Sequence, residues 1–285
     1  AYEVPAWVLE KIKEKQLPLE TFRYLDRWTI DARSPILVVL YSGLASTIDG
    51  ASRDWRKVVD SLLSIGWKES QIIYGTYNFT TTPQPYDEGH STRFPGQNRD
   101  SVRQLFGWLK ERCPLSRLIV CGHSEGGDLV FNAAVSHPDF VNQVIAIDAP
   151  LKGVDRAMVS AGPFEFEELA YFKGCESWPI DDKCEAIRFY TALGESPGFG
   201  EQVENQAKWF GEHGVEVFTP SHQRDPLVAP KQAILENSVK RIVNRDLKLL
   251  WDTPRTSGPF GPHGDLLGHE PFIREFILPV FGRAS

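Results

Sequence analysis

The sequence predicts an α/β fold with a mainly parallel central sheet flanked by helices. Short apolar runs recur along its 285 residues, and each is followed by turn residues and then by a stretch with helical periodicity. Most of these runs are apolar almost without interruption, as in strands buried on both faces of a parallel sheet. Because strands alternate with helices over a length that one domain can hold, we expect a single α/β domain over 1–285.

The expected strands are, in order, ILVVLYSG (36–43), QIIYGTYN (71–78), RLIVCGHS (117–124), QVIAIDAP (143–150), AIRFYTALG (186–194), VEVFTP (215–220) and DLKLLWDT (246–253). Residues 21–30, TFRYLDRWTI, alternate more regularly and favour an antiparallel edge strand. Helices are expected over 99–113, 126–136 and 199–213. The first of these places four apolar side chains on one face: Val102, Leu105, Phe106 and Leu109.

Two segments interrupt this alternation. Residues 77–98 form a loop rich in Pro, Thr and Gly that is longer than compact domains usually carry without a functional reason. Residues 151–185 are an insertion with a helix-like stretch, FEFEELAYF. We expect both to form a cap over a site at the carboxyl ends of the strands. Its apolar lining would include Met158, Phe164, Phe166, Leu169 and Phe172, although a helix packed on the surface would give the same pattern.

Charge and hydropathy exclude several classes of partner. The net charge is −7, which argues against nucleic acid or an anionic membrane surface as the main partner. No apolar run approaches the roughly 18 residues of an integral membrane segment. The first residues, AYEVPAWVLEKIKEK, are charged and amphipathic, so we expect no uncleaved secretory signal. A cytoplasmic protein is favoured, and a mature secreted form stays open.

The four cysteines are too few for a disulfide scaffold and show no C-x-x-C metal spacing. Cys121 lies within an apolar run and is expected to be an inert buried thiol. Cys175 and Cys184 bracket ESWPIDDK and could close a small loop in an oxidising compartment.

The spacing G-x-S-x-G occurs twice, around Ser124 (GHSEG) and around Ser196 (GESPG). A nucleophilic serine of this type needs a strand, a sharp turn and a helix, and the next residue must offer a backbone N–H to the oxyanion. GHSEGG follows RLIV and precedes a helical stretch, and Glu125 has that N–H. Pro197 has none, and a proline also disfavours a strained turn before it. Ser124 is therefore the candidate nucleophile, and GESPG is expected to be an ordinary strand-to-helix turn.

A serine nucleophile needs a histidine base, and in this fold the chain order is serine, acid, histidine. His90, His123 and His137 do not fit that order. His263 lies in a loop rich in Gly and Pro that follows the final expected strand, and it is the candidate base. His269 is the second choice, since it falls in or beside the next helix. We expect these two to be one base and one bystander rather than metal ligands.

For the acid that orients the histidine, Asp225 is the first candidate because it lies at a turn after VEVFTP. Asp148 and Glu195 also follow expected strands, and acids at strand ends are often only turn formers. The order of preference is Asp225, Glu195, Asp148. A second oxyanion donor is expected in YSGLAS, where Gly43 permits a close backbone approach and Leu44 offers its N–H.

These motifs together resemble the α/β-hydrolase superfamily, nearest its lipase and PGAP1-like branches. The resemblance rests on SGLAS, GHSEGG, DAPLKGV, RDPLV and HGDLL and covers roughly 36–280. It implies an esterase or lipase-like hydrolase with the catalytic residues Ser124, Asp225 and His263, the oxyanion donors Leu44 and Glu125, and no cofactor or metal. One departure is Ser42, which stands where the family has a histidine. The implied substrate is a small-molecule or lipid-like ester.

Acyl transfer to another acceptor, or cleavage of a thioester or amide, would use the same residues, and a non-catalytic binding protein can share the fold. The sequence does not indicate the acyl-chain length or the oligomeric state.

Overall fold

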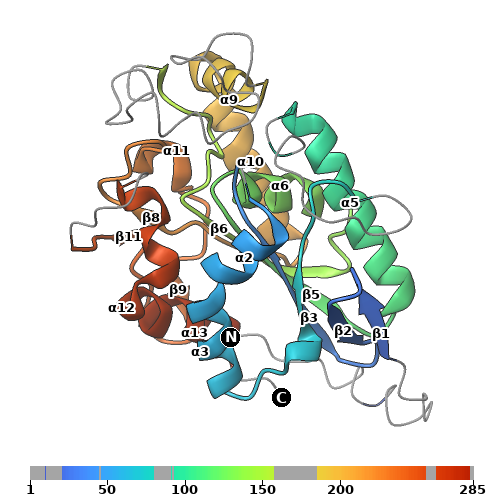
Figure 1. Cartoon of the computed structure of the whole chain (residues 1–285). Helices are drawn as coiled ribbons and strands as arrows, with labels where there is room; N and C mark the ends of the chain where they lie inside the picture. Colours follow the sequence, from blue (N-terminus) through green and yellow to red (C-terminus); the bar gives the residue numbers. More distant parts are fainter. Residues whose placement is uncertain are drawn as a thin grey trace.

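The computed structural model describes residue 10 and residues 21–44, 46–79, 91, 93–156, 185–254 and 261–282 (Figure 1). Its centre is a five-stranded sheet in which all strands run parallel, in the order β4-β3-β5-β6-β7. The strands are β3 (Ile36–Tyr41), β4 (Ile72–Tyr74), β5 (Arg117–His123), β6 (Val141–Ile147) and β7 (Glu216–Phe218). The prediction of an α/β fold with a parallel sheet is confirmed.

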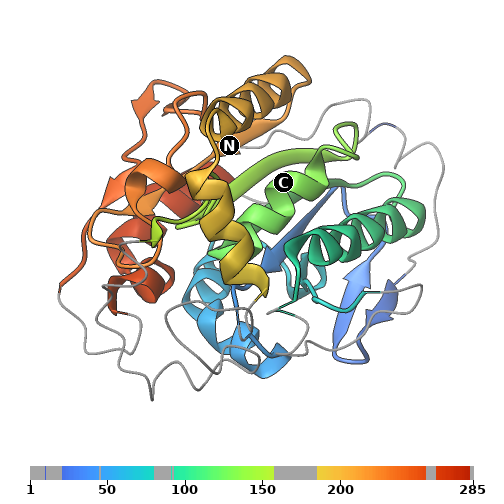
Figure 2. The same cartoon turned by 90° about the horizontal axis from the view of Figure 1, so that it is seen from above.

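The middle strands are buried on both faces, which explains their unbroken apolar sequences. All six residues of β3 are buried, and so are five of seven in β5 and six of seven in β6. A parallel sheet takes this composition when helices cover both of its sides. Figures 1 and 2 show helices on both faces, with α2 and α3 on one side and α5, α6 and α10 on the other.

The helices have these bounds: α2 (Ile48–Asp54), α3 (Arg56–Ser64), α5 (Pro95–Arg112), α6 (Glu125–Ala134), α9 (Glu185–Glu195), α10 (Phe199–Glu212), α11 (Pro230–Ala233), α12 (Glu270–Phe272) and α13 (Leu278–Phe281). Glu69–Gln71 and Gly261–Gly268 form 3-10 helices, and a π-helical turn, Ile273–Ile277, joins α12 to α13. The apolar face expected for α5 is buried as the periodicity predicts.

Two regions expected to be single strands are divided. Residues 21–30 form an antiparallel hairpin of β1 (Thr21–Tyr24) and β2 (Trp28–Asp31), because Leu25 and Asp26 turn the chain with positive φ. Residues 246–253 contribute to β10 (Arg245–Asp246) and β11 (Leu250–Trp251). β10 pairs with β9 (Arg241–Ile242), and β11 pairs in parallel with β8 (Ser221–His222) outside the main sheet.

The strand expected at 186–194 is wrong, because these residues lie in α9. Ala186 and Tyr190 are buried four positions apart, which is the spacing of one helix face. A short apolar run does not by itself distinguish a strand from a buried helix. The segment expected to be a strand and a helix is therefore the helix pair α9–α10, and Ser196 lies in a helix-to-helix turn rather than a strand-to-helix turn.

Several expectations fall on residues outside the described part of the chain. The cap was expected from 77–98 and 151–185, and of these, residues 80–90, 92 and 157–184 are outside the described part. Cys175 and Cys184 belong to the last of these ranges. The cap stays a prediction.

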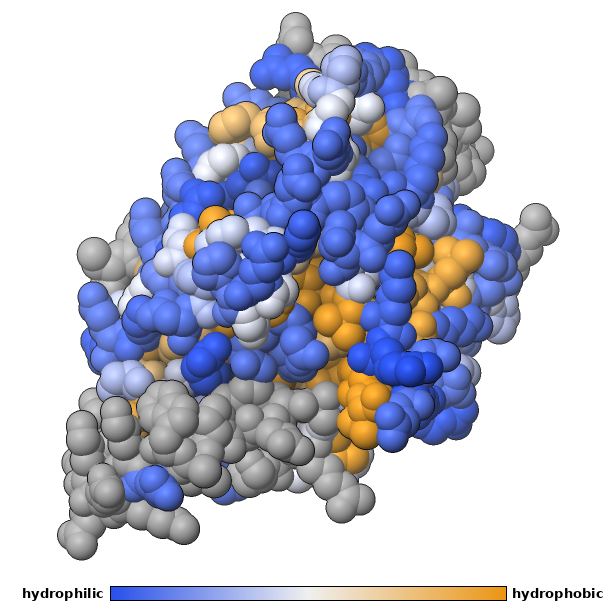
Figure 3. Space-filling model, turned by 180° about the vertical axis from the view of Figure 1, so that it is seen from behind, coloured by the Kyte–Doolittle hydropathy of each residue, from blue (hydrophilic) through white to orange (hydrophobic). Residues whose placement is uncertain are grey.

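Seen from behind, the described surface is mostly hydrophilic, with an apolar strip near its centre (Figure 3).

Candidate active site

Ser124 lies at a sharp turn between β5 and α6. Its backbone has φ 56° and ψ −130°, a region that non-glycine residues rarely occupy. The turn is held because the Ser124 N–H donates to the carbonyl oxygen of Ile147, on the neighbouring strand β6, at 2.9 Å. Backbone strain of this kind costs about 1–3 kcal/mol and persists only where the surroundings fix it, often at functional sites.

The glycines around Ser124 give strand and helix room to approach. A Cβ on Gly122 would come within 2.2 Å of the carbonyl oxygen of Gly126, and one on Gly126 within 2.4 Å of the carbonyl oxygen of Tyr41. A Cβ on Gly43, in the loop after β3, would lie 2.8 Å from the Cβ of Ser124. Glycine is therefore needed at all three positions, because neighbouring atoms fill the space that a Cβ would take.

His263 and Asp225 meet Ser124 at the carboxyl edge of the sheet. His263 lies in the 3-10 helix Gly261–Gly268, and its Nε2 is 2.8 Å from Ser124 Oγ. Its Nδ1 is 2.6 Å from Asp225 Oδ2. The other carboxylate oxygen of Asp225 accepts the backbone N–H groups of Leu227 at 2.8 Å and Val228 at 2.9 Å. The carboxylate is thus fixed by its own turn while it faces the imidazole.

The surroundings of His263 favour its charged form. Burial by itself lowers the pKa of His263, but the charge and hydrogen bond of Asp225 oppose this, together with the charge of Asp148, and the pKa is raised above its ordinary value. An imidazole that gains a proton during a reaction is stabilised in such a setting. The arrangement of a serine, a histidine and a buried carboxylate can activate the serine hydroxyl as a nucleophile.

His123 forms a hydrogen bond with the backbone of His263. We expected it to pack beside the turn, and its Nε2 lies 2.6 Å from the carbonyl oxygen of His263. Because a carbonyl oxygen can only accept, Nε2 carries the proton and donates. Burial, together with charge on His263, lowers the pKa of His123 to about 3, so His123 is neutral. This hydrogen bond links the segment that carries His263 to the strand that carries Ser124.

The other candidate acids and the second serine lie in different surroundings. Glu195 ends α9 at the surface and pairs with Arg156 at 2.6 Å, so its expected place after a strand is wrong. Ser196 donates its hydroxyl to the carbonyl oxygen of Ala192 at 2.8 Å. His269 immediately precedes α12, and its side chain is half-buried. In the described part of the chain, none of these residues forms a hydrogen bond or an ion pair with Ser124 or His263.

Asp148 follows β6 and is fully buried beside the Asp225 turn. Its Oδ1 accepts the backbone N–H of His222 at 2.7 Å and the Ser221 hydroxyl at 3.1 Å. Burial raises its pKa, and the neighbouring charge of Asp225 raises it further. Asp148 therefore supports the turn that carries Asp225, whereas the hydrogen bond to His263 Nδ1 comes from Asp225.

Two residues, Glu125 and Leu44, are expected to donate backbone N–H groups to an oxyanion. Glu125 is the first residue of α6, and Leu44 follows Gly43 in the loop after β3, half-buried. The side chain of Glu125 is 1% exposed and accepts from Asn98 Nδ2 at 3.2 Å. Burial raises the pKa of Glu125 well above its usual value. Burial of the Glu125 side chain therefore favours the protonated form of its carboxyl group.

A group of buried polar side chains that the sequence did not reveal joins the helices α5, α6 and α9. Arg99 of α5 donates to both carboxylate oxygens of Asp128 of α6 at 2.9–3.0 Å, and the Tyr190 hydroxyl of α9 donates to the same carboxylate at 2.8 Å. Asp128 is 1% exposed. Because a buried carboxylate is costly without partners, this group fixes the three helices relative to one another.

No protein-family model matches the chain, and no curated protein matches it in sequence. Among solved structures it is similar to the 2-hydroxy-6-oxo-6-phenylhexa-2,4-dienoate hydrolase of Rhodococcus sp. strain RHA1, with 13% identity over 89% of this chain and 92% of that one and a TM-score of 0.50. The chain has an α/β-hydrolase fold.

Two further solved structures are similar at lower TM-scores. A lipase of Bacillus licheniformis in its mature form is 13% identical over 71% of this chain and 80% of that one, with a TM-score of 0.48. A membrane phospholipase A described as a bacterial virulence factor is 14% identical over 99% and 93%, also with a TM-score of 0.48.

Cys121 lies in β5 and is fully buried, as expected, and burial raises the pKa of its thiol. In the described ranges no three His, Cys, Asp or Glu side chains group as metal ligands would. The part of the chain that the structure describes contains no helix with the length and hydropathy to cross a membrane.

Proposed function

We propose that this chain is a serine hydrolase that cleaves carboxylic esters through an acyl-enzyme on Ser124. One observation carries the proposal: Asp225, His263 and Ser124 form a continuous chain of contacts at 2.6 and 2.8 Å, with the serine on a strained turn between a strand and a helix. Side chains in this arrangement perform acyl transfer on several unrelated folds, because the roles depend on geometry.

In the first half-reaction the Ser124 hydroxyl attacks the ester carbonyl carbon, and His263 Nε2 takes the serine proton. Asp225 holds Nδ1–H and stabilises the imidazolium. When the tetrahedral intermediate collapses, the bond to the leaving alkoxide breaks and His263 gives that group its proton. Water then attacks the acyl-enzyme through the same base, which releases the acid and restores Ser124.

The developing oxyanion would be bound by the backbone N–H groups of Glu125 and Leu44. The Glu125 N–H belongs to the first turn of α6, where such groups have no helical partner. Placement of donors where charge develops is commonly the largest single contribution to this chemistry. The close approach of Gly43 to Ser124 supports a donor from the loop after β3.

The proposed substrate class is a small-molecule or lipid-like ester, because an activated serine hydroxyl can attack the carbonyl carbon of such a molecule. Within the superfamily, the lipase and PGAP1-like affinity indicated by the motifs is part of this proposal. Transfer of the acyl group to an acceptor other than water, and cleavage of a thioester or amide, are outcomes that the test below distinguishes.

The test is hydrolysis of p-nitrophenyl esters from acetate to palmitate by the whole chain, with thioester and anilide analogues and an added alcohol acceptor. Ser124→Ala should lower kcat about 10⁴-fold or more, whereas Ser196→Ala, at the surface turn, should retain wild-type rates. A wild-type rate no higher than the rate without protein would indicate a non-catalytic protein that shares the fold, and equal rates above that level for wild type and Ser124→Ala would refute Ser124 as the nucleophile.

A further inference from the structure

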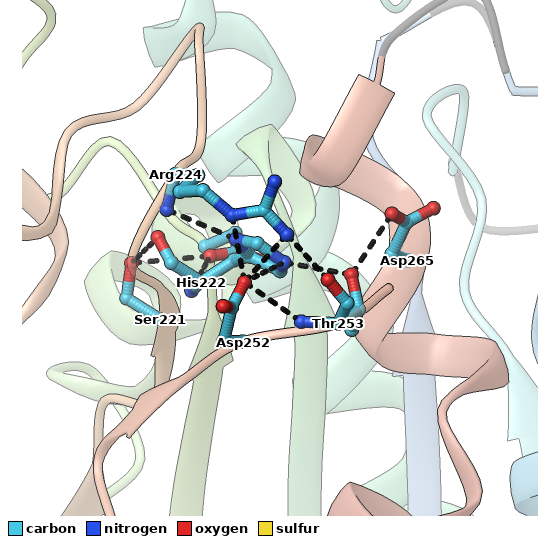
Figure 4. Close-up of polar contacts among 7 residues, drawn as sticks. Ser221, His222, Arg224, Asp252, Thr253 and Asp265 are labelled. Atoms are coloured by element: carbon cyan, nitrogen blue, oxygen red, sulfur yellow. Dashed lines mark hydrogen bonds and ion pairs between the residues drawn. The ribbon is translucent and has the colours of Figure 1, made fainter. Parts of the chain in front are cut away.

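A chain of polar contacts runs from His222 through Thr253 to Asp265 (Figure 4). His222, in β8, is fully buried, and its Nδ1 is 3.0 Å from the backbone nitrogen of Arg224. Its Nε2 is 2.8 Å from Thr253 Oγ1, and that hydroxyl is 3.1 Å from Asp265 Oδ2. The three side chains come from β8, from the residues just after β11, and from the 3-10 helix that carries His263.

The donors and acceptors in this chain have one consistent assignment. A backbone N–H can only donate, so His222 Nδ1 accepts from Arg224 and the ring proton is on Nε2. Nε2 therefore donates to the Thr253 oxygen. The Thr253 hydroxyl keeps its own proton for Asp265, because a carboxylate can only accept. Each member has a single role, and an alternative ring tautomer would place two donors face to face at Arg224.

The backbone of His222 also holds the turn that carries Asp225. Its carbonyl oxygen accepts the N–H of Asp225 at 3.2 Å, and its own N–H donates to Asp148 Oδ1 at 2.7 Å. Asp225 is three residues after His222, and Asp265 is two residues after His263. The chain from His222 to Asp265 thus connects the segment of the acid with the segment of the base.

We propose that His222 and Thr253 are positioning residues, which hold the Asp225 turn and the His263 segment at the separation that their mutual hydrogen bond requires. This inference rests on the proposed function, because it concerns the same serine, histidine and acid. Neither residue would touch the substrate. Each would act by keeping Asp225 Oδ2 and His263 Nδ1 at 2.6 Å.

Charged groups around His222 are compatible with this task. Asp252 Oδ1 lies 3.8 Å from Nε2, and Arg224 pairs with the same carboxylate at 2.6 Å and donates to the Thr253 carbonyl oxygen. Asp225 and Asp265 are the other nearby charges. Burial lowers the pKa of His222, so the ring stays neutral and Nδ1 stays an acceptor at neutral pH.

Thr253 offers a matched pair of variants. Thr253→Val keeps the shape of the side chain but removes the hydroxyl, whereas Thr253→Ser keeps the hydroxyl. Turnover of a p-nitrophenyl ester is measured per active site, with sites counted by a fluorophosphonate that labels the folded enzyme. We expect kcat per site to fall about 10- to 100-fold in Thr253→Val with KM nearly unchanged, because small misplacements of reacting groups have effects of this size. Thr253→Ser should retain most of the activity.

The pH profile separates positioning from a general loss of stability. A looser Asp225–His263 contact removes part of what raises the pKa of His263, so the acid limb of kcat/KM should move to lower pH in Thr253→Val and stay in place in Thr253→Ser. Partial unfolding would reduce the number of labelled sites and leave the limb unmoved.

If Thr253→Val does not fold, Asp265→Asn is compared with Asp265→Leu. Asparagine retains an oxygen that accepts from the Thr253 hydroxyl, and leucine does not, so only Asp265→Leu should lose activity. Equal kcat per site and equal acid limbs within the pair would overturn the positioning role. A wild-type chain that neither labels nor turns over ester would instead refute the proposed function.

Discussion

Replacement of Asp225 by asparagine should impair catalysis, because the two carboxylate oxygens have different hydrogen-bond partners and an amide can replace only one of them as an acceptor. The two carboxylate oxygens have different partners: Oδ1 accepts two backbone N–H groups, from Leu227 and Val228, and Oδ2 faces His263 Nδ1. An asparagine has one oxygen and one NH₂ group. Only the oxygen can accept from the two backbone donors, so the amide is held with its NH₂ group toward His263.

That orientation forces the wrong tautomer. The asparagine NH₂ donates to Nδ1, so the ring proton moves to Nε2, and Nε2 then presents N–H to Ser124 Oγ and cannot take the serine proton. The variant also lacks the negative charge that stabilises the imidazolium. We expect kcat to fall about 10⁴-fold, or about 5 kcal/mol in the barrier, with KM changed little because the turn is kept.

The assay is steady-state hydrolysis of an activated ester, with folding checked by circular dichroism. Two variants serve as controls. Glu195→Gln should retain wild-type kcat, since Glu195 is at the surface and pairs with Arg156, and Asp148→Asn should lose less than Asp225→Asn. Asp225→Asn within tenfold of wild type, beside a collapse in either control, would refute the reasoning.

Three further results are expected. Since His263 must be neutral to act as a base and its pKa is raised, kcat/KM should increase with pH through a midpoint above about 6.5, and a midpoint below that value would contradict the account. Gly43→Ala would place a Cβ 2.8 Å from the Cβ of Ser124 and should lower kcat about 100-fold, whereas Gly211→Ala, with open space around its Cβ, should not, as steady-state rates will test. Glu125→Gln should raise the Tm at neutral pH. The folded carboxyl has a raised pKa, so wild-type stability falls as pH rises above about 4.3, where the unfolded chain ionises, and the gain should vanish in thermal scans below that pH.

The sequence predicted the elements whose physical causes are local. The buried strands of the parallel sheet are visible as unbroken apolar runs, and Pro197 argued against Ser196 because it lacks an N–H. The strand expected at 186–194 failed because a nine-residue apolar stretch fits either a strand or a helix face, and its burial against neighbouring helices decides between them. That error also placed Glu195 at a strand end where there is none.

Contacts between distant parts of the chain could not be predicted. His123 and His263 are 140 positions apart, and nothing in either segment indicates that a ring nitrogen of one meets the carbonyl oxygen of the other. The buried side chain of Glu125 accepts a hydrogen bond from Asn98, which the sequence analysis placed in the loop 77–98 and the structure places in α5. Side-chain partners of this kind follow from packing, which a local pattern does not contain.

The central claim is a covalent acyl-enzyme on Ser124, and the most direct measurement is the mass of the intact chain after reaction with a fluorophosphonate, followed by peptide mapping. The account predicts one adduct per chain, located on the peptide that contains GHSEGG, and none in Ser124→Ala. It also predicts slower labelling when His263 is replaced. An adduct on Ser196, or no adduct on a folded wild-type chain that still hydrolyses the ester, would contradict the account.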